Sequence, residues 1–391
     1  MNPLFAELPT SVFEHMSGLA RQHGAVNLGQ GFPDFGWPDD VLEKAAEGLR
    51  HGSNQYAPMR GLPELRQAIA GHYAAHQGLD FGPEEVTVTS GATEALASAI
   101  SALVAPGDEV LLFQPLYDAY LPLVRRAGGV PRFVTLRPPD WRITREAVEE
   151  AVTDRTRLVI LNNPHNPAAR MFGREELQIV ADAAQASGAV VLSDEVWEHL
   201  AFDGRKHLPI SGLPGMRERT VKIGSAGKIF SVTGWKVGWI VAPEELAVPI
   251  SKAHQFVTFC TPPNLQAAVA YGLGKEQGYF DSMRAAFQNA RDDMVEQLRS
   301  AGFIPLQTEG TYFLAIDLAA SGIAAGDVEF CERAVSEAGV AAIPVSRFYE
   351  LDAAENIIRV CFAKRADTIR AGVQKLAEAK GLFLRFRNGN E

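Results

Sequence analysis

Four short motifs combine amide, carboxylate and amine side chains with small residues. They are Asn162-Asn-Pro-His-Asn166-Pro167, Ser193-Asp194-Glu195-Val-Trp197, Ser225-Ala-Gly-Lys228 and Gly234-Trp-Lys236-Val-Gly238. We expect each motif to follow a strand, which places all four at the carboxyl edge of a sheet, where α/β proteins bind ligands. The sequence therefore predicts one polar site built from distant segments.

Lys228 and Asp194 carry the most specific chemistry. The small residues before Lys228 allow a close backbone approach and confine one amine, which could form a Schiff base with an aldehyde cofactor. Such chemistry needs a carboxylate beneath a pyridine nitrogen, where it keeps the ring protonated and able to accept electrons. Asp194 follows an apolar run and fits this need. Taken alone, Lys228 could be a surface lysine and Asp194 a helix N-cap.

Signatures of metal and nucleotide binding are missing from the sequence. His72 and His76 are four residues apart on an expected helix, but no third ligand has a recognisable spacing, so we interpret them as a solvated helix face. Gly29-Gln-Gly31 lacks the third glycine of a dinucleotide loop, and Ile229 stands where a phosphate loop needs Ser or Thr. No metal is predicted, and the sequence argues against an NTPase or a dehydrogenase.

The elements that must position these residues alternate between strands and helices. Short apolar runs predict strands at Val86–Thr89, Val110–Phe113, Arg132–Leu136, Arg157–Leu161, Ala189–Leu192, Thr220–Ile223 and Val237–Val241. Helices are expected at Thr93–Val104, Arg174–Ser187 and Glu244–Gln255. Continuous apolar runs are typical of strands buried on both faces, so we predict an α/β fold around a mostly parallel seven-stranded sheet.

A second, smaller α+β domain follows. Its expected elements are helices at Tyr279–Ala301, Val328–Ala338 and Ala366–Ala379 and strands at Tyr312–Ile316 and Ile357–Phe362. We therefore divide the chain into an N-terminal arm at 1–38, a large domain at 39–280 and a small domain at 281–391. The arm is expected to join the small domain.

Composition limits the class of protein. The 391 residues are 47% hydrophobic and carry a net charge of −10, which suits a globular protein and argues against nucleic acid or an anionic membrane as a partner. The three cysteines are widely spaced, which argues against a disulfide framework. The N-terminus has no signal peptide pattern, so we expect a cytoplasmic protein.

The ordered set of motifs resembles the class I, fold type I aminotransferases that use pyridoxal 5'-phosphate. It is most similar to the branch of kynurenine, glutamine and methionine aminotransferases, and also to N-succinyldiaminopimelate aminotransferases. The resemblance extends from Asn27-Leu-Gly-Gln-Gly-Phe-Pro-Asp-Phe35 to Ile358-Arg-Val-Cys-Phe362 and so covers nearly the whole chain.

The resemblance implies a role for each matching residue. Lys228 forms the Schiff base and then moves the substrate proton, and Asp194 pairs with the pyridine nitrogen. The other expected cofactor contacts are Asn166 and Trp197 at the ring oxygen, Tyr117 stacked on the ring, and Gly91, Ala92, Thr93, Ser225 and Lys236 at the phosphate. A helix N-terminus after Ser90 suits an anion on physical grounds as well.

Substrate contacts are implied in the same way. Arg359 matches the arginine that binds the substrate carboxylate, and its fork geometry suits that task. Tyr56 matches a tyrosine that reaches the phosphate of a neighbouring subunit, which implies a homodimer with shared active sites. The remaining expected substrate contacts are Phe13, Gly31, Asn166, Phe259 and Tyr312.

Two positions depart from the family pattern. Trp197 replaces the usual tyrosine, so a bulkier indole that only donates a hydrogen bond stands near the ring oxygen. The segment Ala168-Ala-Arg170 replaces a Thr/Leu-Gly pair.

We expect a ping-pong transaminase of amino acid metabolism that uses amino acids and 2-oxo acids. The aromatic pocket candidates favour methionine, glutamine, phenylalanine or kynurenine-like donors. The alternatives are an N-succinyldiaminopimelate aminotransferase and a cysteine-S-conjugate β-lyase.

Overall fold

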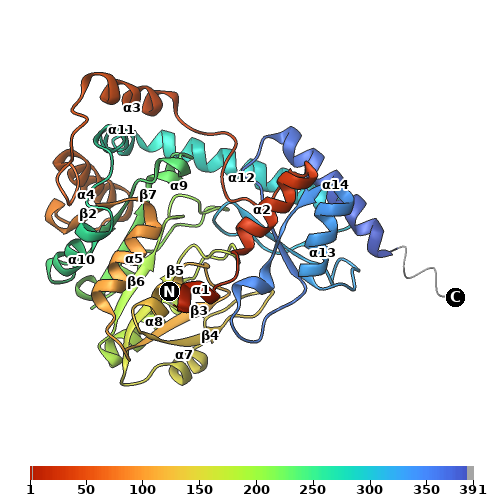
Figure 1. The fold of residues 1–391 in the computed structure, drawn as a ribbon, viewed down its shortest axis with the longest axis horizontal. Coiled ribbons are helices and arrows are strands. Elements are labelled where there is room, and N and C mark those ends of the chain that lie inside the picture. Colours follow the sequence, from red (N-terminus) through yellow and green to blue (C-terminus); the bar gives the residue numbers. More distant parts are fainter. Residues whose placement is uncertain (2, 385–391) are drawn as a thin grey trace.

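The computed structural model describes residues 1 and 3–384. Its larger part is built on a seven-stranded sheet in the order β2-β8-β7-β6-β5-β3-β4 (Figure 1). These strands are β2 (Val86–Thr89), β3 (Glu109–Gln114), β4 (Val130–Thr135), β5 (Thr156–Asn162), β6 (Val190–Asp194), β7 (Thr220–Ser225) and β8 (Gly238–Val241). All seven expected strands are present, which confirms the predicted α/β class.

The sheet is mostly parallel, with one exception. Strand β8 pairs antiparallel with both β2 and β7. The expectation that every motif follows a strand is therefore wrong for Lys236, which precedes β8. Because β8 is antiparallel, its first residues still lie at the carboxyl edge of its neighbours, and Gly238 is opposite both Thr89 and Ser225.

Helices cover the sheet on both faces, and their apolar sides form the core with it. The helices of this part are α3 (Asp39–His51), α4 (Pro63–Gln77), α5 (Gly91–Leu103), α6 (Tyr120–Arg126), α7 (Arg145–Ala151), α8 (Arg174–Ser187), α9 (Ala226–Ile229), α10 (Glu244–Val257) and α11 (Pro263–Leu273). Among the described helices, none is long and apolar enough to cross a membrane.

The smaller part contains a four-stranded sheet in the order β12-β13-β10-β9. Its elements are α12 (Gln277–Ser300), β9 (Ile304–Pro305), β10 (Phe313–Asp317), α13 (Asp327–Arg333), β11 (Val340–Ala341), β12 (Ile343–Pro344), β13 (Ile357–Cys361) and α14 (Ala366–Leu384). A π-helical turn, Ala334–Ala338, extends α13. Figure 1 shows α12 running from the larger part to the smaller one.

The described residues of the N-terminal arm contact the smaller part, as expected. It contains α1 (Pro3–Glu7), α2 (Val12–His23) and β1 (Val26–Asn27), and β1 pairs parallel with β11. The exact domain boundaries stay a prediction: α12 continues across the expected division at 280/281, and residues 385–391 of the expected small domain lie outside the described residues.

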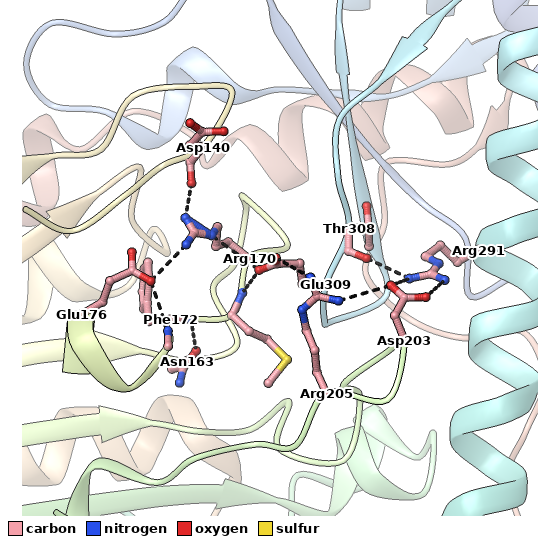
Figure 2. Close-up of polar contacts among 12 residues, drawn as sticks. Asp140, Asn163, Arg170, Phe172, Glu176, Asp203, Arg205, Arg291, Thr308 and Glu309 are labelled. Carbon is pink, nitrogen blue, oxygen red and sulfur yellow. Dashed lines mark hydrogen bonds and ion pairs between the residues drawn. The ribbon is translucent and has the colours of Figure 1, made fainter. Parts of the chain in front are cut away.

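Arg170 links the two parts (Figure 2). Its guanidinium pairs with Glu176 at 3.0 Å, in the first turn of α8, and with Glu309 at 3.4 Å, in the loop before β10. Glu309 also pairs with Arg205 at 3.0 Å and accepts a hydrogen bond from the Met171 N–H. The departure at Ala168-Ala-Arg170 therefore has a structural consequence, because Arg170 anchors the loop after Asn166 to the loop before Tyr312.

One expectation about the histidines is wrong. His72 is buried rather than solvated, and its Nε2 lies 2.8 Å from Nε2 of His199. His76 is partly exposed and lies beside His72, with ring centroids 4.2 Å apart. The three cysteines are all free, and two of them, Cys331 and Cys361, are buried.

Candidate active site

A cavity of about 350 Å³ lies between the carboxyl edge of the large sheet, the N-terminal arm and the small part. The four motifs meet there, although they are far apart in the sequence. Its lining residues are Phe13, Gln30, Gly31, Gly91, Ala92, Thr93, Leu96, Tyr117, Tyr120, Asn162, Asn166, Asp194, Val196, Trp197, Ser225, Gly227, Lys228, Thr233, Lys236, Val237, Phe313 and Arg359.

Lys228 stands in α9, the short helix directly after β7. Its Nζ donates a hydrogen bond to the Tyr312 hydroxyl at 3.1 Å and lies 4.7 Å from the centre of the Trp197 ring. Burial lowers the pKa of Lys228 to about 8. A substantial fraction of this amine is therefore neutral near physiological pH, as a nucleophile or a base requires.

Asp194 ends β6 and is buried. Its Oδ2 accepts a hydrogen bond from the Tyr120 hydroxyl at 2.6 Å, and its Oδ1 accepts one from the Val196 N–H at 3.4 Å. Burial raises the pKa of Asp194, and the bond from Tyr120 opposes that rise. The carboxylate is thus held in one orientation toward the cavity.

Arg359 lies in the middle of β13 and is fully buried. One Nη donates to the Asn166 Oδ1 at 2.7 Å, the other donates to the Gly29 carbonyl at 3.2 Å, and its Nε has no partner among the described residues. No described carboxylate forms an ion pair with it. Burial lowers the pKa of Arg359 to about 10, so the group stays charged at neutral pH. A buried cation without a counter-ion is a binding site for an anion.

Aromatic rings surround this guanidinium. Its Cζ lies 3.8 Å from the centre of the Phe313 ring, 5.1 Å from Phe13 and 5.4 Å from Phe348. The rings exclude water and attract the cation through their faces. They also give the neighbouring part of the cavity an apolar wall.

The turn from Ser90 to Thr93 starts helix α5 at the edge of the sheet. Gly91 has φ of +75°, a conformation that favours glycine, and a Cβ there would lie 3.1 Å from the Lys236 Nζ. A Cβ on Gly238 would lie 2.7 Å from the Gly91 carbonyl carbon. The two glycines bring the helix N-terminus and the Lys236 amine together, so the cavity has a second cationic end.

Most of the residues predicted for the site line the cavity, and three do not. Tyr312 is buried behind the wall, where its hydroxyl contacts Lys228 and the Gly31 carbonyl. Tyr56 and Phe259 lie on the surface, with ring centroids 5.4 Å apart, and Tyr56 is 83% exposed. Neither of these two side chains lines the cavity of this chain.

Sequence reasoning missed several cavity residues, including Gln30, Tyr120 and Phe313. The spacing of Tyr120, three residues after Tyr117, was a signal in the sequence. In the structure the two rings lie edge to face, with their centroids 5.6 Å apart. Phe313 follows Tyr312 in a strand and contacts Arg359.

Comparison with known proteins gives a consistent result. The family model "Aminotransferase class I and II" matches residues 23–376. A probable N-succinyldiaminopimelate aminotransferase of Mycobacterium tuberculosis is 42% identical over 94% of this chain and 96% of its own length. The methionine aminotransferase of Escherichia coli is 40% identical over 96% of this chain and 99% of its own. Human kynurenine–oxoglutarate transaminase 1 is 37% identical over 93% of this chain and 94% of its own.

Solved structures have the same architecture. A methionine aminotransferase of Escherichia coli superposes with a TM-score of 0.92 at 40% identity, covering 96% of this chain and 98% of its own. The N-succinyldiaminopimelate aminotransferase of Mycobacterium tuberculosis gives 0.93 at 41% identity, with coverage of 96% and 99%.

Proposed function

Because the chain belongs to the class I and II aminotransferase family, whose members depend on pyridoxal phosphate, we propose that it transfers the amino group of an apolar, aromatic or sulfur-containing L-amino acid to a 2-oxo acid. One observation carries the proposal. The unpaired guanidinium of Arg359 shares a cavity with the Lys228 amine, so an amino acid bound by its carboxylate can present its Cα to that amine.

The residues present fit pyridoxal phosphate. The Ser90–Thr93 turn and Lys236 offer a cationic end for a phosphate, Asp194 offers a carboxylate for a pyridine nitrogen, and Lys228 offers an amine for an aldehyde. When bound, this group would supply an aldehyde that captures the substrate amine and a ring that accepts electrons from the Cα–H bond.

Three residues of the chain would then act on the substrate and the cofactor. The Lys228 amine would take the proton from the substrate Cα and return it at the carbon that the cofactor's aldehyde supplies, a transfer that its lowered pKa favours. Asp194, fixed by Tyr120, balances a positive charge on the ring nitrogen. The Asn166 amide, held by Arg359, orients the ring oxygen. Reversal of these steps with a 2-oxo acid would return the amino group to that acid and give ping-pong kinetics.

The preference for uncharged donors rests on the cavity wall. Phe13, Tyr117, Trp197 and Phe313 line it, and Arg359 is the only arginine among the described lining residues. An acidic donor side chain would have no second guanidinium to pair with, so its desolvation would be uncompensated. The wall therefore favours methionine, glutamine, phenylalanine and kynurenine-like donors over aspartate.

A homodimer with shared active sites is also part of the proposal. Four apolar side chains from two segments are exposed on the surface: Tyr56, Phe256, Val257 and Phe259. Contiguous exposed apolar groups mark protein contact sites. If a second copy covers them, Tyr56 can reach the phosphate end of its neighbour's cavity. Sedimentation equilibrium tests this, and a monomer at micromolar concentration would contradict it.

A matrix of amino donors and 2-oxo acids tests the proposed substrate class. We expect the highest kcat/KM with methionine, glutamine or an aromatic donor, and parallel lines in double-reciprocal plots. A strong preference for aspartate would contradict the proposal. Preference for the N-succinyldiaminopimelate pair would support that alternative, and release of pyruvate and ammonia from a cysteine conjugate without an oxo acid would support the β-lyase.

A further inference from the structure

His254 is a fully buried histidine in α10, outside the cavity. Its Nδ1 lies 3.0 Å and 3.1 Å from the two carboxylate oxygens of Glu94, and its Nε2 lies 2.9 Å from the Met59 carbonyl oxygen. A carbonyl and a carboxylate can only accept hydrogen bonds. Both ring nitrogens must therefore donate, which requires the imidazolium form.

The alternative is a protonated Glu94 beside a neutral His254. Both carboxyl oxygens of Glu94 already act as acceptors, for the Ser90 N–H at 2.9 Å and the Ser98 hydroxyl at 2.6 Å. An imidazole is also the more basic partner in water, by about two pKa units. Burial alone would lower the pKa of His254, but the bond and the charge of Glu94 outweigh it and raise that pKa. The backbone of Met59 and Phe259 faces the ring as well.

Glu94 stands in the first turn of α5, the helix whose N-terminus forms one end of the cavity. Its carboxylate fixes the Ser90 N–H, directly before Gly91. An anion in this position also repels any other anion bound at the same helix end. A positive charge on His254 would cancel that repulsion while leaving the Ser90 contact intact.

The same ring touches the loop that carries Tyr56, since Met59 is three residues further along. Phe256 and Val257 are the last two residues of α10, and Phe259 follows shortly after; all three side chains belong to the exposed apolar ones named above. His254 therefore contacts Glu94 in the first turn of α5 and the backbone of the loop that carries Tyr56, and it stands two residues before Phe256 in α10.

We propose that His254 is a positioning residue whose positive charge neutralises Glu94 and so lets the Ser90–Thr93 turn hold the cofactor phosphate. This inference rests on the proposed function, because it takes the turn as the phosphate site. It assigns no contact between His254 and the cofactor itself.

The test compares two ligands of the apoenzyme, pyridoxal phosphate and pyridoxal, which lacks the phosphate. We expect His254→Gln to raise the Kd of pyridoxal phosphate on the order of tenfold or more, because an uncompensated carboxylate remains. The Kd of pyridoxal should change less than about twofold. The double variant Glu94→Gln/His254→Gln should bind pyridoxal phosphate more tightly than His254→Gln. Equal losses for both ligands, or no loss, would overturn the inference.

His72→Gln is the matched control, since it removes another buried imidazole, whose hydrogen-bond partners are the Leu273 carbonyl and His199 rather than Glu94. If the wild type binds pyridoxal phosphate no more tightly than pyridoxal, the phosphate site itself fails, and with it the proposed cofactor contacts. A measurement on the wild-type protein keeps the inference testable even if the His254→Gln variant does not fold. With ¹⁵N-labelled histidine at about pH 7.5, above the ordinary histidine pKa, one ring should carry protons on both nitrogens. Its absence would equally overturn the inference.

Discussion

The guanidinium of Arg359 donates a hydrogen bond to the side-chain oxygen of Asn166 over 2.7 Å. This contact joins β13 of the small part to the loop after β5 of the large part. The residue proposed to bind the substrate carboxylate thereby orients the residue proposed to touch the cofactor ring.

Arg359→Lys should weaken substrate binding while leaving cofactor binding in place. A lysine cannot maintain the fork that contacts Asn166, Gly29 and a carboxylate together. We expect KM for the amino donor to rise on the order of 10- to 100-fold, as for loss of hydrogen bonds to a charged group. Steady-state kinetics measures this, with the exposed Arg365→Lys as the control. An unchanged KM would argue against the assigned role.

Asp194→Asn should retain the cofactor but lose turnover. The amide keeps the size of the side chain but cannot balance a positive charge on the ring nitrogen. We expect kcat to fall on the order of 10²- to 10³-fold, the usual effect of removing one electrostatic stabiliser. Absorbance titration should show near-normal cofactor binding. Full activity in this variant would contradict the role of Asp194.

Gly91→Ala should weaken cofactor binding. Alanine at φ of +75° is strained, and its Cβ would press on the Lys236 Nζ. A strain of ~1–2 kcal/mol corresponds to a rise in the Kd of pyridoxal phosphate of roughly 5- to 30-fold. Gly24→Ala is the control, because Gly24 has φ of +60° but open space around a Cβ. If both variants bind the cofactor alike, the turn is not the phosphate site.

The lowered pKa of Lys228 predicts a distinctive pH dependence in the apoenzyme. Acetylation of Lys228 should reach half its maximal rate near pH 8, whereas a free lysine derivative should require a pH near the ordinary lysine value of about 10.4. Between pH 8 and 10.5 only the unfolded chain holds this proton. The group's contribution to the free energy of unfolding therefore rises with pH in that range. Identical profiles for Lys228 and the free lysine derivative would disprove the shift.

The strands and helices could be predicted because strands buried on both faces appear in the sequence as continuous apolar runs. The apolar run that became β5 is buried along almost its whole length, and helix α8 begins and ends at the predicted residues. The antiparallel direction of β8 could not be read from its apolar run, because strand direction is set by the packing of distant neighbours. For that reason Lys236 was predicted to follow a strand, whereas it precedes β8.

The site could be predicted only where it follows family motifs. Lys228, Asp194 and Arg359 belong to recognisable segments, and the structure brings them to one cavity. The pairing of His254 with Glu94 joins residues 160 positions apart, and no spacing rule encodes such a contact. The burial of His72 was missed for the same reason, since its partner His199 lies on another segment.

Chemical trapping of the cofactor tests the central claim most directly. Reduction of the cofactor-loaded enzyme with borohydride, followed by peptide mass spectrometry, should find a pyridoxyl group on Lys228, and Lys228→Ala should lose both the adduct and the visible absorbance. An adduct on another lysine in the wild type, or no adduct at all, would contradict the proposed active site.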